Sequence, residues 1–403
     1  MSHQIALSAR QVIALTALMI LAFTASLGMP FNIDAIVSSF HVGNSAAGLV
    51  VSAEMLAIAI GTLLIGVVAA RVPATRIYAI CLCAIVGLNL LSILVSNVPM
   101  LILLRVPQGL ALGAVVATVM ATAARSSRPD ATFGIINASV GAMGIIIGFV
   151  LPRALRLHEW LPVASPLGGL YFVYALFSAC AFLFLRIVPV APPVTVAGAQ
   201  PAQFPPRRWL GLLGLGLVFF GHAVLGVFIV NLGRAIGMSA ITIGYALMIG
   251  AVLGVVAPLV AGQLGARVSA FIWVSTLALL IAGCAFVLAS AHSAAAFFVI
   301  APLYGVLPMA LIPVFLGALA RVDTTGRLAS AHPAFVLVGG SIAPFVGGAL
   351  SDAGGYLANA SVVATCAVIG MLLMWTDLRS SDIVRTALHT SAREPGPKAQ
   401  ATA

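Results

Sequence analysis

Twelve long apolar runs, separated by short polar segments, are the feature that most limits how this chain of 403 residues can fold. A helix needs about 20 mostly apolar residues to cross the hydrocarbon core of a bilayer. The strands of a membrane barrel would be about 10 residues long and would alternate apolar with polar positions. The runs therefore predict an all-α membrane protein with transmembrane helices over residues 11–33, 44–69, 76–96, 99–123, 132–152, 167–188, 209–232, 240–262, 270–290, 294–318, 329–350 and 356–377.

The composition excludes a soluble protein and offers no metal site. Hydrophobic residues make up 62% of the chain and charged residues only 7%, whereas a soluble domain carries about 25% charged residues. The net charge of +10 does not indicate nucleic-acid binding, because the basic residues occur singly or in pairs and form no stripe. All five cysteines lie inside apolar runs, so we expect neither a disulfide framework nor a metal centre.

A proline-rich segment divides the chain into two halves of six helices each. Residues 1–188 form the N-terminal half and residues 208–378 the C-terminal half. Residues 189–207 between them contain six prolines and are expected to form a flexible cytoplasmic linker. Residues 379–403, rich in Ala, Pro and Thr towards their end, are expected to be a disordered cytoplasmic tail.

The positions of the basic residues predict the orientation. If both termini are cytoplasmic, fifteen basic residues lie on the cytoplasmic side and only Arg153, Arg156 and Arg234 lie outside. Such an excess of arginine inside is typical of membrane proteins. Lysine is nearly absent and alanine is abundant, which suggests a GC-rich bacterial genome. We therefore expect a multi-pass protein of the bacterial inner membrane.

The two halves share short matching segments. A shift of 196 residues aligns residues 66–72 with residues 262–268, with four of seven positions identical. The same shift places Gly109 on Gly305 and Gly144 on Gly340. Matches at corresponding places predict parallel repeats related by an axis along the membrane normal, an architecture that holds its binding site between the halves.

The loop after the second run carries a recognisable spacing of glycine and arginine. Its positions are Gly66, Ala69, Ala70, Arg71, Pro73 and Arg76, and Arg267 occupies the equivalent loop of the second half. The loop resembles the Gly-x-Leu-Ala-Asp-Arg-x-Gly-Arg-Arg pattern of the major facilitator superfamily. Ala70 stands where the family has aspartate, so the charge clamp that this loop makes in many relatives is expected to be weak or made elsewhere. An ordinary positive-inside loop is the alternative interpretation.

The fourth run contains Arg105, Gln108, Gly109 and Gly113 in one short stretch. This stretch is similar to the Arg-x-x-Gln-Gly-x-Gly motif of the same superfamily. An arginine inside a membrane span is costly and usually has a partner or a task. The alternative is that Arg105 extends to the outer membrane interface.

Glycines gather on the fifth run, at Gly141, Gly144 and Gly148, and on the eleventh run, at Gly339, Gly340, Gly347 and Gly348, together with Pro344. Small residues allow close helix packing and the rocking of one half against the other. The fifth run lacks the Gly-Pro pair that is typical of the family's drug:proton antiporters, since Phe149 follows Gly148. Ordinary membrane packing explains the same glycines.

Several other polar residues fall within or at the ends of the spans. Glu54 lies about ten residues into the second span, near the bilayer midplane, where a carboxyl can take and release a proton. Asp34 lies at the outer end of the first span, and His222 lies in the seventh. We also expect Gln108, Asn231 and Tyr304 to be substrate contacts. Each could instead be a structural hydrogen-bonding group.

These features predict a secondary transporter and no enzyme. The sequence has neither the Gly-x-x-x-x-Gly-Lys-Ser/Thr nucleotide loop nor a His-Glu-x-x-His motif, so no cofactor is implied and an ion or solute gradient must supply the energy. The resemblance implies alternating access. Because Arg105 and Glu54 both lie within apolar spans, where a charge is costly, we expect them to be the functional charges of the first half. We expect proton-coupled movement of a small organic solute by a monomer in the lipid bilayer, with a lean towards uptake of an organic or aromatic acid. Drug or sugar efflux by proton antiport, and a non-transporting membrane sensor or scaffold, are the alternatives.

Overall fold

The computed structural model describes residues 6–69, 72–160, 165–189, 206–265, 268–322 and 327–391, and within these ranges the regular structure is entirely helical. The α-helices are α1 (Ala9–Leu27), α2 (Met29–Phe40), α3 (Asn44–Ala69), α4 (Ala74–Ile93), α5 (Val98–Ala124), α6 (Pro129–Ala154), α7 (Pro166–Ala181), α8 (Pro206–Gly226), α9 (Ile229–Ala235), α10 (Ala240–Gly265), α11 (Ala270–Ala289), α12 (Ala294–Val322) and α13 (Arg327–Ser391). Two short 3-10 turns, η1 (Leu157–Glu159) and η2 (Phe182–Phe184), flank α7.

The all-helical membrane architecture predicted from the sequence is confirmed. Eleven segments of the described chain are long and apolar enough to cross a membrane, and the last of them, residues 332–384, holds two of the expected spans. These two are joined at Gly355, whose φ of 67° is in the left-handed region that glycine adopts without strain. Apolar runs thus identified the elements, and the bounds differ by a few residues at most ends.

The first span of each half is broken into two helices. In the N-terminal half, α1 ends at Leu27, and α2 begins after Gly28 with Pro30 in its first turn, where a missing N–H costs nothing. In the C-terminal half, α8 ends at Gly226 and α9 begins at Ile229. Each half therefore has a long helix followed by a short one, and the expected spans 11–33 and 209–232 each include such a break.

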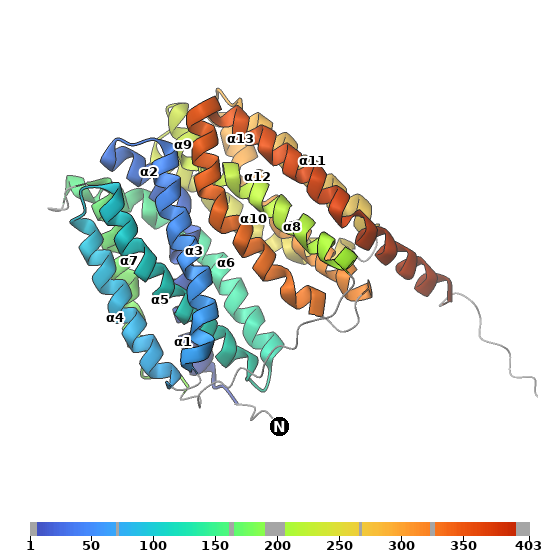
Figure 1. Ribbon diagram of the computed structural model, residues 1–403, viewed down its shortest axis with the longest axis horizontal. Helices are drawn as coiled ribbons and strands as arrows, with labels where there is room; N and C mark the ends of the chain where they lie inside the picture. Colours follow the sequence, from blue (N-terminus) through green and yellow to red (C-terminus); the bar gives the residue numbers. More distant parts are fainter. Residues whose placement is uncertain are drawn as a thin grey trace, which may run out of the picture.

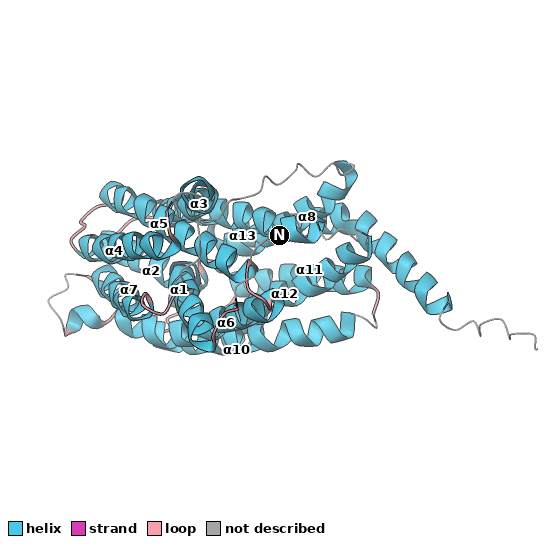
Figure 2. Cartoon of the chain, turned by 90° about the horizontal axis from the view of Figure 1, so that it is seen from below, coloured by secondary structure: helices cyan, strands magenta, loops and turns pink. Residues whose placement is uncertain are grey.

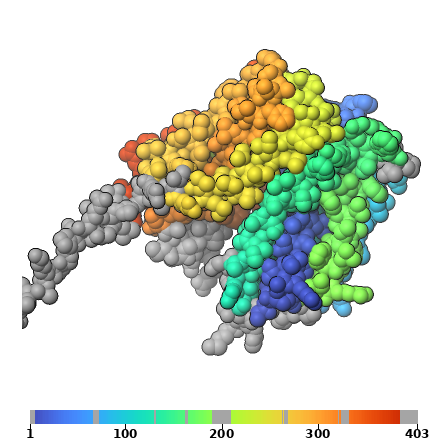
Figure 3. Space-filling model, turned by 180° about the vertical axis from the view of Figure 1, so that it is seen from behind, coloured from blue at the N-terminus to red at the C-terminus, as the bar shows by residue number. Residues whose placement is uncertain are grey.

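The two halves lie side by side and touch mainly along two pairs of long helices (Figures 1 and 2). α3 packs against α13, and α6 packs against α10. Both contacts depend on glycine: a side chain on Gly48 would overlap the backbone of Pro344, and one on Gly244 would overlap the Gly148 carbonyl. The space-filling view shows the contact of α6 with α10 (Figure 3). Small residues let the two backbones approach closely, as in other membrane helix pairs.

The halves are joined at one end and diverge at the other. They meet at the end that carries α2 and α9, and they separate towards the end where the chain begins (Figure 1). We call the first the sealed end, formed by Asp34, Asn44, Asn231, Arg234 and Asp352, and the second the diverging end.

The expected domain bounds are only partly covered. Most of the 189–207 linker, residues 190–205, lies outside the described residues. The expectation of a disordered tail from residue 379 is wrong for residues 379–391, because α13 continues to Ser391. Asp382 accepts hydrogen bonds from the backbone N–H groups of Ala270 and Phe271 at the start of α11, and Arg321 Nε donates to Ser381 Oγ at 2.7 Å. These contacts hold the start of the segment against the bundle.

Candidate functional site

A cavity of about 470 Å³ lies between the two halves. It is bounded by the junction of α1 with α2, by α6, by the junction of α8 with α9, by α10 and by α12. Both helix breaks therefore open onto the same space. The volume is in the range of sites that enclose a small organic molecule.

Glycines and apolar side chains form nearly all of the cavity wall. Seven of its lining residues are glycines: Gly141, Gly144, Gly148, Gly226, Gly250, Gly254 and Gly305. A side chain built on Gly254 or Gly305 would meet no atom within 4 Å, so the space exists because these positions lack one. Among the described residues that line the cavity, none is charged, and the polar side chains are those of Ser26, His222 and Tyr304.

His222 and Tyr304 are locked together across the C-terminal half. The Tyr304 hydroxyl donates to the His222 carbonyl at 2.7 Å, and His222 Nε2 lies 3.2 Å from the Tyr304 carbonyl. The two rings are stacked with their centroids 4.4 Å apart. These contacts fix the orientation of the one imidazole that faces the cavity.

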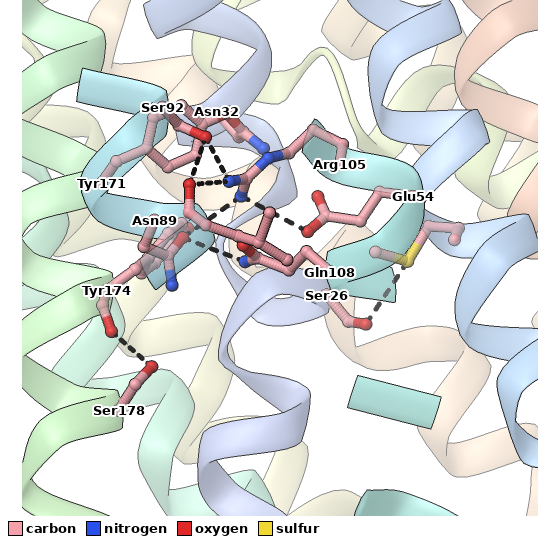
Figure 4. A network of polar contacts seen from close by, with 12 residues as sticks. Ser26, Asn32, Glu54, Asn89, Ser92, Arg105, Gln108, Tyr171, Tyr174 and Ser178 are labelled. Atoms are coloured by element: carbon pink, nitrogen blue, oxygen red, sulfur yellow. Dashed lines mark hydrogen bonds and ion pairs between the residues drawn. The ribbon is translucent and has the colours of Figure 1, made fainter. Parts of the chain in front are cut away.

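A second polar group lies inside the N-terminal half and away from the cavity. We call it the Arg105 cluster: Arg105, Glu54, Asn89, Ser92, Gln108 and Tyr171 (Figure 4). Arg105 is completely buried. Its guanidinium donates to Asn89 Oδ1 at 3.2 Å and to Ser92 Oγ at 2.5 Å, and it lies 4.3 Å from the centre of the Tyr171 ring. Pro107 lies inside α5, two residues beyond Arg105.

Glu54 lies opposite Arg105, but the two side chains leave hydrogen-bonding atoms of both residues unpaired. Arg105 Nη1 and Glu54 Oε1 are 3.7 Å apart, an ion pair but longer than a hydrogen bond. Both side chains are 1% exposed. Glu54 Oε1 and Arg105 Nε have no hydrogen-bond partner. Unmade bonds in a buried charged pair are costly, so this pair is not held by a complete set of hydrogen bonds.

The Arg105 cluster is connected to the cavity and to the sealed end through α2. The Tyr171 hydroxyl donates to Asn32 Oδ1 at 3.1 Å. Asn32 is adjacent to Phe31, which lines the cavity, and two residues from Asp34. A change in the cluster can therefore reach both places through one short helix.

The sealed end is held by three polar contacts between the halves. Arg234 Nη2 lies 3.3 Å from Asp34 Oδ2. Asp352 accepts from the backbone N–H groups of Asn44 and Ser45 at 2.9 and 2.8 Å, at the start of α3. The side-chain amides of Asn231 and Asn44 are 3.5 Å apart. Burial raises the pKa of Asp34, which lies beyond the Ala9–Leu27 span, and the opposing attraction of Arg234 is the smaller effect.

The residues expected at the site fall in separate places. His222 and Tyr304 line the cavity. Arg105, Glu54 and Gln108 belong to the Arg105 cluster, where Gln108 Nε2 donates to Asn89 Oδ1 at 3.0 Å. Asp34 and Asn231 lie at the sealed end. The sequence analysis did not identify Asn89, Ser92, Tyr171, Ser26 and Asp352, and it assigned Arg234 only to an outer loop. Single polar residues in an apolar run carry no pattern that would have revealed these contacts.

The glycine and loop positions are distributed differently again. Gly109 packs α5 against the Glu54 backbone, Gly148 packs against α10, and Pro344 packs against Gly48. Gly144 lines the cavity, and a side chain on Gly340 would meet nothing within 4 Å. Gly66 lies in α3 and Arg76 is exposed in α4. Arg71 and Arg267 lie outside the described residues.

Comparisons with known proteins agree with this architecture. A family model described as Major Facilitator Superfamily matches residues 13–327. A crystal structure of the nucleoside transporter NupG superposes with a TM-score of 0.65 at 14% identity, covering 92% of this chain and 99% of that one.

A bacterial homolog to the human lysosomal transporter Spinster, in an inward-facing and occupied conformation, superposes with a TM-score of 0.67 at 16% identity, covering 94% and 96%. At these identities the likeness concerns the fold. No curated protein matches the sequence. Because the family model covers more than three quarters of the chain and the fold agrees with it, this chain belongs to the Major Facilitator Superfamily, a family of membrane transporters.

Proposed function

We propose that the protein is a proton-coupled secondary transporter that carries a small organic solute across the bacterial inner membrane by alternating access. The observation that carries this proposal is the cavity of about 470 Å³ between the halves, with polar contacts closing one end and the halves diverging at the other. Helices from both halves line the cavity, so a rocking motion of one half against the other would change which end gives access to it.

The coupling proton is assigned to Glu54. When Glu54 is ionised it attracts Arg105 across 3.7 Å, and when it is protonated that attraction is lost while Arg105 keeps its bonds to Asn89 and Ser92. Tyr171 lies against the Arg105 guanidinium and is hydrogen-bonded to Asn32 in α2. Protonation would therefore alter the packing of α2, which lies beside the solute and at the sealed end.

The orientation follows from the distribution of arginines. With both termini in the cytoplasm, the diverging end faces the cytoplasm and the sealed end faces the periplasm. This conformation is then the inward-facing state, from which a solute exchanges with the cytoplasm.

The second candidate is efflux by proton antiport, and the cavity wall favours it over uptake of an acid. The lean towards organic acids depended on Arg105 as a contact for a carboxylate. Arg105 is buried in the N-terminal half, and the described residues that line the cavity include no cation. An apolar solute crosses lipid without help, so a gradient-driven transporter gains most by expelling it.

The test is solute-driven proton movement in proteoliposomes that contain the purified full chain and a trapped pH-sensitive dye. Addition of a transported solute should acidify or alkalinise the lumen of wild-type vesicles, and the sign gives symport or antiport. Glu54→Gln should abolish this signal and preserve exchange of labelled solute across the membrane. Glu159→Gln is the matched control, because Glu159 is an exposed acid paired with Arg156. Wild-type proton movement in Glu54→Gln would remove Glu54 from the coupling mechanism.

A further inference from the structure

The cavity wall limits the charge of its occupant. An ionised carboxylate or ammonium taken from water into an apolar space is strongly unfavourable unless an opposite charge meets it. The lining residues described here offer no such charge, and the ion pairs of Glu54 and Asp34 lie elsewhere in the protein. The occupant is therefore neutral when bound.

Glycine gives the wall its shape. Gly141 and Gly144 on α6 face Val255 and Ala251 on α10, and Gly254 and Gly305 open directly onto the cavity. The wall on α6 and α10 is therefore largely backbone and small side chains, while larger side chains such as Leu27, Phe31 and Met309 line other sides. A flat ring system can make close van der Waals contact with the glycine-rich side. The stacked rings of His222 and Tyr304 add an aromatic surface at one side.

The polar groups in the cavity are arranged to accept hydrogen bonds. Nε2 of His222 faces the Tyr304 carbonyl at 3.2 Å. A carbonyl can only accept, so Nε2 carries the proton of the neutral ring and Nδ1 is left as an acceptor. Nδ1 is 3.8 Å from the position that a Cβ on Gly226, itself a lining residue, would occupy.

The second acceptor comes from the other half. Ser26 in α1 donates its hydroxyl hydrogen to Met55 Sδ at 3.4 Å, which leaves the oxygen lone pairs of Ser26 available. The Tyr304 hydroxyl hydrogen is already donated to the His222 carbonyl. An occupant must therefore supply the donor. A sugar or a nucleoside, with several hydroxyls, would leave most of them unpaired against an apolar wall.

We propose that the cavity binds a neutral, planar, fused-ring compound with one N–H or O–H donor, which is directed to His222 Nδ1 or Ser26 Oγ. This assignment rests on the proposed transport function, because it takes the cavity as the place where the solute is carried. The sequence favoured an organic or aromatic acid as the solute, whereas the cavity favours an aromatic compound that carries no acid group.

Direct binding to the full chain in lipid nanodiscs tests the proposal without any proton gradient. The probes are carbazole, with three fused rings and one N–H; 9-methylcarbazole, which lacks the donor; carbazole-3-carboxylate, which adds an anion; and uridine. Carbazole should bind saturably, and 9-methylcarbazole about fivefold to tenfold more weakly, as expected for the loss of one neutral hydrogen bond. The carboxylate and uridine should show no saturable binding.

Two variants assign the binding to the cavity. Gly305→Leu should abolish carbazole binding, while Gly283→Leu on α11, an exposed position where a side chain would also meet no atom within 4 Å, should bind as the wild type does. With both acceptors removed, in His222→Phe combined with Ser26→Ala, carbazole and 9-methylcarbazole should bind alike. Gly254→Leu is the second cavity-filling variant if Gly305→Leu does not fold.

The outcomes separate this inference from the proposed function. Any of three results overturns the inference. The first is tighter binding of the carboxylate or uridine than of carbazole, and the second is no saturable binding of carbazole. The third is unchanged carbazole binding in both cavity-filling variants. Proton movement driven by another class of solute would then leave the transport function standing. Carbazole binding without carbazole-driven proton movement in proteoliposomes would uphold the inference and count against the coupling.

Discussion

Arg234 Nη2 lies 3.3 Å from Asp34 Oδ2 and joins the two halves of the protein across 200 residues of sequence. Asp34 belongs to α2 and Arg234 to α9, the short helices that follow the broken first span of each half. The pair therefore links equivalent elements at the sealed end. Its partners differ in exposure: the Asp34 side chain is 10% exposed and that of Arg234 is 45% exposed, so water screens the attraction in part.

Removal of Arg234 alone should make the cavity more accessible from the sealed end, because it leaves the partly buried Asp34 carboxylate without its ion-pair partner. We expect Arg234→Gln to increase the labelling rate of a single cysteine at Ser26 by an impermeant maleimide added on that side. The increase should be up to about fivefold, since partly exposed ion pairs contribute about 0.2–1 kcal/mol. The background would lack the native cysteines. Reversal of both charges together should restore slow labelling, whereas an effect of equal size from Glu159→Gln would show that general surface charge is responsible.

The sealed end should also respond to pH through Asp34. Burial raises the pKa of Asp34 above its ordinary value of 3.8 despite the attraction of Arg234. The closed sealed end therefore binds a proton on Asp34 more tightly than an open state in which the carboxyl faces water. Protonated Asp34 stabilises the closed state fully below pH 3.8, and this stabilisation is lost as the pH rises through the raised pKa. Labelling at Ser26→Cys, divided at each pH by the rate for a free thiol to correct for the thiolate fraction, should therefore accelerate as the pH rises through that window.

Asp34→Asn should remove this dependence. Arg156, His158, Glu159 and Arg234 line the same outer recess and Asp352 lies at the sealed end, so His158→Gln is the control for titration of a neighbour. A pH profile that persists in Asp34→Asn and disappears in His158→Gln would assign the effect to the histidine.

The buried pair in the N-terminal half should behave as a coupled unit. Arg105→Ala leaves the buried Glu54 carboxyl without its ion-pair partner, and breaking such a pair typically costs about 3–5 kcal/mol. We expect a marked fall in the melting temperature of Arg105→Ala in detergent. Arg105→Ala combined with Glu54→Gln should recover part of that loss, because no unpaired acid remains. Additive effects of the two substitutions would mean that the pair does not interact.

The sequence predicted this pair better than its surroundings. Arg105 and Glu54 stand out as charges in apolar runs, and their depths in two spans that run in the same direction are close enough for contact. Asn89, Ser92 and Tyr171 complete the cluster, but an uncharged polar residue in an apolar run is indistinguishable from one that caps its own helix. The partners of Arg105 depend on how α4, α5 and α7 are packed, which no single span reveals.

The cavity and the sealed end were harder to predict for the same reason. Gly109 and Gly305 are equivalent under the 196-residue shift, yet Gly109 packs against the backbone of α3 and Gly305 opens onto the cavity. A glycine in an apolar run indicates only a position without a side chain. It does not show whether that position packs against a neighbouring helix or opens onto a cavity. Asp34 was recognised, and its partner Arg234 was not, because their contact exists only when the halves are assembled.

The contact between Gly148 and Gly244 should control closure of the sealed end. A Cβ on Gly244 would overlap the Gly148 carbonyl and would lie 2.5 Å from Pro152 Cγ, so even alanine must push α10 away from α6. Both glycines lie near the sealed end of their helices, where Ala240 and Leu155 line the outer recess. Gly244→Ala should therefore raise labelling of Ser26→Cys from that side, and Gly244→Val should raise it further and slow transport.

The control for this prediction is Gly283→Ala, at an exposed position where a Cβ would meet no atom within 4 Å. It has the same effect on helix propensity, since alanine favours a helix over glycine by about 1 kcal/mol. The control should leave labelling and transport unchanged while raising the melting temperature slightly. If Gly244→Ala also left labelling and transport unchanged, the contact between α6 and α10 would tolerate an added methyl group at this point. Closure of the sealed end would then depend on the polar contacts of Asp34, Asn44 and Asp352 alone.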